Sequence, residues 1–150
     1  MPTIRGKLRD GRFPVLRVVI SNDLGLPPID DMGPQTLVPQ EEVVLALIDT
    51  GATTSMLSHD LCDRLRLEQA GLKEFLFANA PHAEVMTTHA GTLFLHEEVG
   101  GAGRRHEWPD IVTFGRMNLG TRLYQAVLGM DVITGGELRL QSGHAITFDF

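Results

Sequence analysis

The chain is poor in cysteine and in clustered positive charge. Cys62 is the single cysteine among 150 residues, which excludes an internal disulfide and slightly favours a reducing compartment. Lys and Arg number 13 against 19 Asp and Glu, for a net charge of −6, and they form no basic stripe. Because a protein that binds nucleic acid neutralises phosphates with clustered positive charge, we expect no nucleic-acid partner.

Long apolar runs and metal-binding spacings are also missing. No stretch approaches the ~18 apolar residues of a membrane span, and residues 1–10 lack the apolar core of a signal peptide. We therefore expect a cytoplasmic protein without a membrane partner. The histidines are too widely spread for a zinc site, so no metal or other cofactor is expected.

What is present indicates one globular, mostly β domain over residues 1–150. The chain is 43% hydrophobic and 21% charged, as in ordinary globular proteins. Its apolar runs are short, rich in Val, Ile, Leu, Thr or Phe, and bounded by Gly, Pro, Asn or Asp, which predicts strands. These runs are Val15–Ile20, Val43–Ile48, Leu93–Leu95, Ile111–Phe114, Leu123–Leu128, Glu137–Leu140 and Ala145–Phe150.

The other segments predict a long loop and two short helices. Residues 22–40 contain four prolines and form an inserted loop between the first two predicted strands. His59–Arg66 is a helix capped by Ser58, and Asp131–Thr134 is a second one ended by glycines. The last two predicted strands alternate around Ser142-Gly143, which is typical of a closing hairpin.

Chemistry is concentrated where an apolar strand runs into Asp49-Thr50-Gly51-Ala52. We interpret Gly51 as permitting a tight turn, which presents the Asp49 carboxylate at a strand end within reach of backbone N–H groups. Taken alone, Asp49 could be an ordinary turn or helix-cap aspartate. Further along, an apolar run ends in Gly129, which by itself fits a simple turn glycine.

Together these two motifs resemble retropepsin-like aspartic peptidases. Residues 45–57 are similar to the family's catalytic loop, and residues 126–133 to its hydrophobic-hydrophobic-Gly motif, which crosses beside that loop in a ψ-shaped arrangement. The resemblance implies a closed, orthogonal β-barrel with one or two short helices, active as a C2 dimer. It assigns catalysis to Asp49, Thr50 and Gly51, substrate contacts to Ala52 and Thr53, and a structural ψ-loop to Leu128 and Gly129.

A homodimer is expected because the mechanism needs two carboxylates and the chain has one Asp-Thr-Gly. The two Asp49 carboxylates of the dimer would share one proton, so that one activates water while the other polarises the scissile carbonyl. The resemblance further implies that Thr50 hydrogen-bonds across the dimer. It also implies that residues 145–150 form a terminal strand interleaved with the partner chain.

The family's β-hairpin flap should lie between the first helix and Gly129. Our candidate is Phe75–Thr88, with Phe77–Asn79 pairing with Glu84–Met86. The tip, and with it further substrate contacts, is assigned to Asn79, Ala80, Pro81 and His82.

The leading functional hypothesis is an endopeptidase that binds an extended peptide or protein segment as an added strand. One alternative is a non-catalytic dimerisation or peptide-binding module with the same fold. Another is an unrelated β-barrel class that carries the motif by chance, which a monomeric mass would favour.

Overall fold

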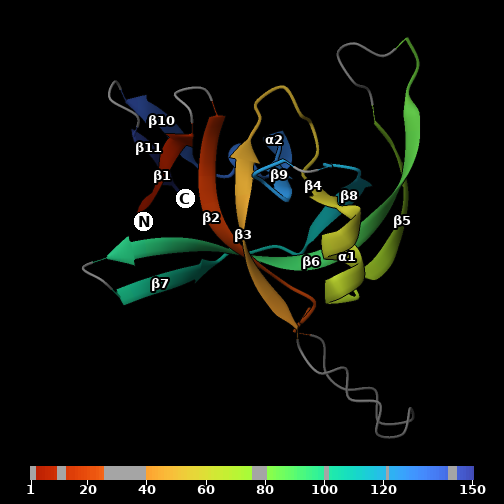
Figure 1. Cartoon of the computed structure of the whole chain (residues 1–150), viewed down its shortest axis with the longest axis horizontal. Helices are drawn as coiled ribbons and strands as arrows, with labels where there is room; N and C mark the ends of the chain where they lie inside the picture. The colour runs from red at the N-terminus through yellow and green to blue at the C-terminus, as the bar shows by residue number, and fades with distance from the viewer. Residues whose placement is uncertain are drawn as a thin grey trace, which may run out of the picture.

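The computed structural model describes residues 3–9, 13–25, 40–75, 81–99, 102–120, 122–141 and 145–150 (Figure 1). It is mostly β, as predicted. Its elements are β1 (Thr3–Arg9), β2 (Phe13–Ser21), β3 (Glu41–Ile48), β4 (Met56–Ser58), α1 (His59–Leu65), β5 (Glu68–Phe75), β6 (Glu84–Val99), β7 (Ala102–Glu107), β8 (Val112–Met117), β9 (Ala126–Leu128), α2 (Met130–Ile133), β10 (Glu137–Gln141) and β11 (Ala145–Asp149).

Six strands pair in a closed circuit. The order runs β2, β3, β9, β4, β8 and β6, and β6 pairs back with β2. The β3–β9 and β4–β8 pairs are parallel, and the other pairs of the circuit are antiparallel. Beyond β2 the sheet continues through β1 and β11 to β10, while β5 and β7 both pair with β6.

The main apolar core draws on the strands of this circuit and on both helices. Along β3 every second side chain, from Val44 through Ala46 to Ile48, is buried, as expected for a strand with one face on a core. Phe148 of β11 stacks on Trp108 with ring centroids 6.2 Å apart. The terminal strand is thereby packed on the same core.

All seven predicted strands are present, and the structure adds four. The prediction for 123–128 was too long, because pairing begins only at Ala126. The strands we missed are β1, β4, β5 and β7. Three of them carry many charged side chains, and β5 is mostly exposed, so hydrogen bonds to β6 rather than an apolar pattern define it.

Both predicted helices form within a residue or two of the expected bounds. Ser58 caps α1 as expected, its hydroxyl accepting the Leu61 backbone N–H at 3.2 Å. The helix ends at Arg66 in a left-handed conformation. No described helix is long and apolar enough to cross a membrane.

The terminal strand was expected to interleave with a partner chain, and with a single chain this stays a prediction. β11 pairs with β10 along one edge and with β1 along the other, all within the same chain. Both of its hydrogen-bonding edges are therefore occupied. The predicted closing hairpin of β10 and β11 is confirmed.

The inserted loop of residues 22–40 connects β2 to β3, which are the second and third strands rather than the first two. Residues 26–39 lie outside the described part of the chain. The ends of the loop are held together, since Asn22 N–H donates to the Gln40 carbonyl at 3.0 Å and Gln40 N–H to Asn22 Oδ1 at 2.8 Å.

Candidate functional site

Asp49 stands at the end of β3, beside the end of β9. The parallel pairing of the two strands sets Ile48 opposite Leu128, and the Asp49 N–H donates to the Leu128 carbonyl at 3.0 Å. Parallel pairing brings the carboxyl ends of both strands to one place. The structure therefore brings together the two motifs that were singled out in the sequence.

Two backbone N–H groups of the loop after β3 form hydrogen bonds to Asp49. The Gly51 N–H donates to Asp49 Oδ1 at 2.9 Å, and the Ala52 N–H to the Asp49 carbonyl at 3.1 Å. Asp49 is half-buried, whereas Thr50, Gly51 and Thr53 are exposed. One carboxylate oxygen is thus oriented by the backbone while the loop remains open to solvent.

Gly51 is suited to its position for a different reason from the one we predicted. Its φ is not positive, so the turn does not need a glycine for its backbone conformation. A Cβ at this position would lie 3.2 Å from Asp49 Oδ1. A side chain would crowd the carboxylate oxygen that accepts the Gly51 N–H.

Gly129 is required by close packing of the two motifs. A Cβ there would come within 2.8 Å of the Ala52 carbonyl oxygen and of the Thr54 carbonyl carbon. The next residue, Met130, donates its N–H to the Ala52 carbonyl at 2.7 Å. Leu128 is almost fully buried in the core. This geometry fits the structural role expected of Leu128 and Gly129.

Ser55 and Asp131 link the two motifs, and sequence reasoning missed both. The Ser55 hydroxyl donates to Asp131 Oδ1 at 2.7 Å and accepts the Gly129 N–H at 2.9 Å. The Ser55 N–H lies 3.0 Å from each Asp131 carboxylate oxygen. We had read Asp131 only as the start of a short helix. Its place two residues after Gly129 was the available signal.

A second apolar cluster lies beside the loop that carries Asp49. It consists of the buried side chains Met56, Phe75, Leu119 and Val127, with Leu47, Ala52, Met86, Met117 and Tyr124 partly buried around them. Leu47 lies two residues before Asp49, and Val127 lies two residues before Gly129. The cluster includes Ala52 of the loop itself, three residues after Asp49.

The predicted flap corresponds to the β5–β6 hairpin, with a corrected register. Glu84, Val85 and Met86 pair with residues 73–75 of β5, not with 77–79. Figure 1 shows this hairpin rising past the body of the molecule on the side of the loop after β3. Asn79 and Ala80 lie outside the described residues, while Pro81 and His82 are exposed and have no described contact with Asp49.

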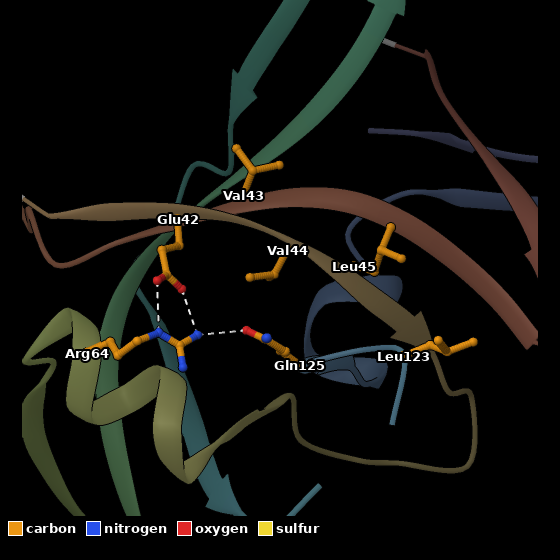
Figure 2. A pocket seen from close by; sticks show the side chains of 7 residues that line it. All are labelled: Glu42, Val43, Val44, Leu45, Arg64, Leu123 and Gln125. Atoms are coloured by element: carbon orange, nitrogen blue, oxygen red, sulfur yellow. Dashed lines mark hydrogen bonds and ion pairs between the residues drawn. The ribbon is translucent and has the colours of Figure 1, made fainter. Parts of the chain in front are cut away.

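A separate hollow lies at the opposite end of β3. It is an open depression of about 670 Å³. Figure 2 shows the side chains that line it, which are Glu42, Val43, Val44, Leu45, Arg64, Leu123 and Gln125. The Arg64 guanidinium donates to both Glu42 carboxylate oxygens and to Gln125 Oε1, each at 2.9 Å. The guanidinium holds the pKa of Glu42 below its usual range. The hollow contains none of the predicted site residues.

The described residues were compared for groups of side chains that could hold a metal ion. Among those residues no group of three or more His, Cys, Asp or Glu side chains is placed to hold an ion.

Comparison with solved structures finds a match to the crystal structure of a retropepsin-like aspartic protease from Rickettsia conorii. The match covers 99% of this chain and 91% of that one, with a TM-score of 0.53 and 14% sequence identity. The fold is retropepsin-like. No protein-family model and no curated protein sequence matches the chain.

Within this retropepsin-like fold, the described chain provides one Asp-Thr-Gly loop. The loop is braced by Gly129 and by the Ser55–Asp131 contact, and is flanked by apolar surface and by the β5–β6 hairpin. Chemically, the arrangement offers a half-buried carboxylate with one oxygen oriented by a backbone N–H.

Proposed function

We propose that the chain is an aspartic endopeptidase of the retropepsin type, acting as a C2 homodimer. The observation that carries the proposal is the placement of Asp49. Its carboxylate accepts the Gly51 N–H, and its loop is fixed against Gly129 at the meeting point of β3 and β9. A carboxylate held in this way is oriented before substrate binds.

The reaction requires two Asp49 carboxylates, one from each chain, with a single proton between them. The ionised carboxylate removes a proton from a water molecule, which attacks the peptide carbonyl carbon. The protonated carboxyl donates a hydrogen bond to the carbonyl oxygen. Collapse of the tetrahedral intermediate breaks the C–N bond, and a carboxyl proton passes to the leaving amine.

Substrate would lie as an extended strand between the tip of the β5–β6 hairpin and the loop that carries Asp49. The predicted contacts are the backbone at Ala52 and Thr53 below the peptide and Asn79, Ala80, Pro81 and His82 above it. Backbone hydrogen bonds give such a strand affinity, and side-chain pockets give preference. Because the partly buried Ala52 and Met86 present apolar surface at the second apolar cluster, we expect a preference for apolar residues beside the scissile bond.

Thr50 is proposed to hold the two catalytic loops together. It is exposed in the single chain, so its hydroxyl is accessible to a partner. A hydrogen bond to the partner loop would keep both carboxylates in register. We keep the cytoplasm as the proposed location, since the single cysteine gives no disulfide to stabilise an extracellular form.

The test is cleavage of a proteome-derived peptide library by the wild type and by Asp49→Asn, from acidic to alkaline pH. We expect a bell-shaped rate profile for the wild type, because only the singly protonated pair is active, and no turnover for the variant. Asp60→Asn, which changes an exposed aspartate on α1, is the matched control and should cleave normally.

Undiminished cleavage by Asp49→Asn would place the chemistry on another residue. Peptide binding without cleavage by the wild type would instead favour the non-catalytic peptide-binding module. A folded Asp49→Asn protein is expected, since the amide has the same shape as the carboxylate and can still accept the Gly51 N–H.

A further inference from the structure

The hollow at the end of β3 away from Asp49 runs along a backbone edge of that strand. Its lining includes the four consecutive residues 42–45. Successive side chains of a strand point to opposite faces, so a hollow on one face would touch only every second residue. Contact with four residues in a row indicates that the hollow lies against the edge. Figure 2 shows Arg64 of α1 and Gln125 facing this stretch of β3.

This edge is the one that β9 leaves uncovered. β2 pairs with β3 from Glu41 to Leu47 on the other edge, whereas β9 pairs only with Ala46 to Ile48. The Gln125 N–H reaches the Leu45 carbonyl at 3.1 Å. Ahead of Leu45, no strand in the described part of the chain pairs with β3 on the β9 side.

The backbone groups of Val43 face the uncovered edge. The Leu45 carbonyl and the Asp49 N–H both bond on the β9 side, while the Gln40 carbonyl bonds to Asn22 at the end of β2. Alternate residues of a strand direct their N–H and C=O groups to the same edge, so those of Val43 point with those of Leu45. Val43 is 59% exposed. Its N–H and carbonyl have no partner on that edge among the residues described.

The acidic side chains beside the edge are already paired. Glu41 accepts hydrogen bonds from Arg105 Nη1 at 2.7 and 2.8 Å, and Glu42 accepts from Arg64 Nε and Nη2 at 2.9 Å. Free charges often shield an open strand edge, and these two carboxylates are neutralised instead. The Nη1 group of Arg64 donates to no described residue, so its N–H groups are available in the hollow.

We propose that the hollow is a second peptide site, in which an extended peptide with an acidic side chain adds as a strand to the open edge of β3. Its backbone exchanges hydrogen bonds with Val43, and its carboxylate accepts from Arg64 Nη1. Apolar side chains of the peptide contact Val43 and Leu123, which is 64% exposed. An extended peptide is the occupant that fits, because another strand supplies donors and acceptors at the spacing of the edge.

This site is distinct from the proposed catalytic one. Val43 and Asp49 are six residues apart along β3, or roughly 20 Å. The inference does not depend on cleavage, since it uses no group of the Asp49 loop.

The test is a titration of ¹⁵N-labelled Asp49→Asn protein, which should leave the probe uncut, followed by amide chemical shifts. The probe is the peptide acetyl-Val-Thr-Glu-Val-Thr-amide. We expect shift changes at residues 41–45 and at Gln125. A twin with Gln in place of Glu should bind at least fivefold more weakly. A twin N-methylated at every residue should not bind, because it has no backbone donors.

Two variants separate the backbone contact from the ionic one. Val43→Pro removes the N–H on the open edge and leaves the β2 ladder intact, so the dissociation constant of the probe should rise at least tenfold. Val43→Ala keeps that N–H and should stay within threefold of the parent protein. Circular dichroism checks that both fold, and the N-methylated probe tests the same hydrogen bonds on unaltered β3.

Arg64→Gln should also weaken binding at least fivefold, and should abolish the difference between the Glu and Gln probes. Its matched control is Arg139→Gln. Arg139 likewise donates two hydrogen bonds to a glutamate, Glu137, but lies on β10 and does not line the hollow. The Arg139 variant should bind both probes as the parent does.

The inference is overturned if millimolar probe leaves the shifts of residues 41–45 unchanged, or moves only those of Gly51 and Ala52. Equal affinity for the N-methylated twin would also overturn it. Shifts at 41–45 that change with protein concentration in the absence of probe would assign the edge to a second copy of the chain instead. Probe binding at β3 by a protein whose wild type cleaves no peptide would support this site and contradict the proposed function alone.

Discussion

β3 carries a polar network at each of its ends, and the two networks differ mainly in exposure. At the Asp49 end, the hydroxyl of the fully buried Ser55 bridges Asp131 and the Gly129 N–H. At the other end, Arg64 bridges Glu42 and Gln125 in an open hollow, with the Arg64 and Glu42 side chains 45% and 36% exposed. Distances are similar in both places, since all of these contacts lie between 2.7 and 2.9 Å.

Hydrogen-bond distances alone therefore do not show which of the two networks contributes more to stability. Water can replace the partners of Arg64 when they are removed, so little free energy is lost. The Gly129 N–H has no such replacement, and leaving it unpaired costs the full desolvation of a buried group. Rigidity is therefore concentrated at the end of β3 where we place the chemistry.

The largest effect on stability should come from Gly129→Ala. The added Cβ would lie 2.8 Å from backbone atoms of the loop that follows Asp49, which must move to accommodate it. We expect a loss of about 3 kcal/mol in the free energy of unfolding and loss of peptidase activity. Urea titration measures the first and the peptide assay the second.

Gly51→Ala is the variant to compare with Gly129→Ala. The Cβ added at Gly51 would meet only a side-chain oxygen, at 3.2 Å. We expect a smaller stability loss there, with activity still impaired by displacement of the Asp49 carboxylate. Equal stability losses at the two glycines would contradict the close-packing role assigned to Gly129.

An intermediate effect is expected for Ser55→Ala. The change leaves the Gly129 N–H without its partner and removes a hydrogen bond to Asp131, at a cost of about 2 kcal/mol. Thr53→Ala, in the same loop but exposed, is the stability control and should unfold like the wild type. If Ser55→Ala were as stable as the wild type, the buried network would not brace the loop.

The smallest effect should follow from Glu42→Gln in the open hollow. We expect less than ~0.5 kcal/mol at neutral pH, because solvent screens a half-exposed ion pair. Arg64 lowers the pKa of Glu42 from its usual 4.5, so the contribution is present above that value. It is lost as the pH falls through the lowered pKa.

The measurement is the difference in unfolding free energy between wild type and Glu42→Gln at neutral pH and near pH 3. The difference should shrink toward zero in acid. A loss as large as that of Ser55→Ala would remove the contrast between the two ends of β3.

Much of the site could be predicted because its parts are local in sequence. The apolar strand that runs into Asp-Thr-Gly and the later apolar run ending in glycine could each be read locally. That the two lie side by side came from the resemblance to retropepsin-like peptidases, and the pairing of β3 with β9 agrees with it. The strands with alternating or continuous apolar side chains were found for the same reason. Ser58 identified the start of α1 by its side-chain chemistry.

Strands without an apolar pattern could not be found in this way. β5 and β7 are defined by hydrogen bonds to β6, a partner that lies elsewhere in the sequence. The predicted register of the flap hairpin was wrong for the same reason. Nothing local in the sequence distinguishes residues 73–75 from 77–79 as the partner of Glu84–Met86. Ser55 and Asp131 were missed because their contact spans 76 positions.

The sequence by itself determined the strand-rich class, the capped first helix and the candidate carboxylate at Asp49, because each depends on side-chain chemistry within a few residues. Only the tertiary structure decided that β11 pairs on both edges with β1 and β10 of its own chain. It alone also showed that Ser55 braces Gly129. Both outcomes depend on which distant segments share a sheet or a buried corner, and pairing over such distances is set by the packing of the whole core.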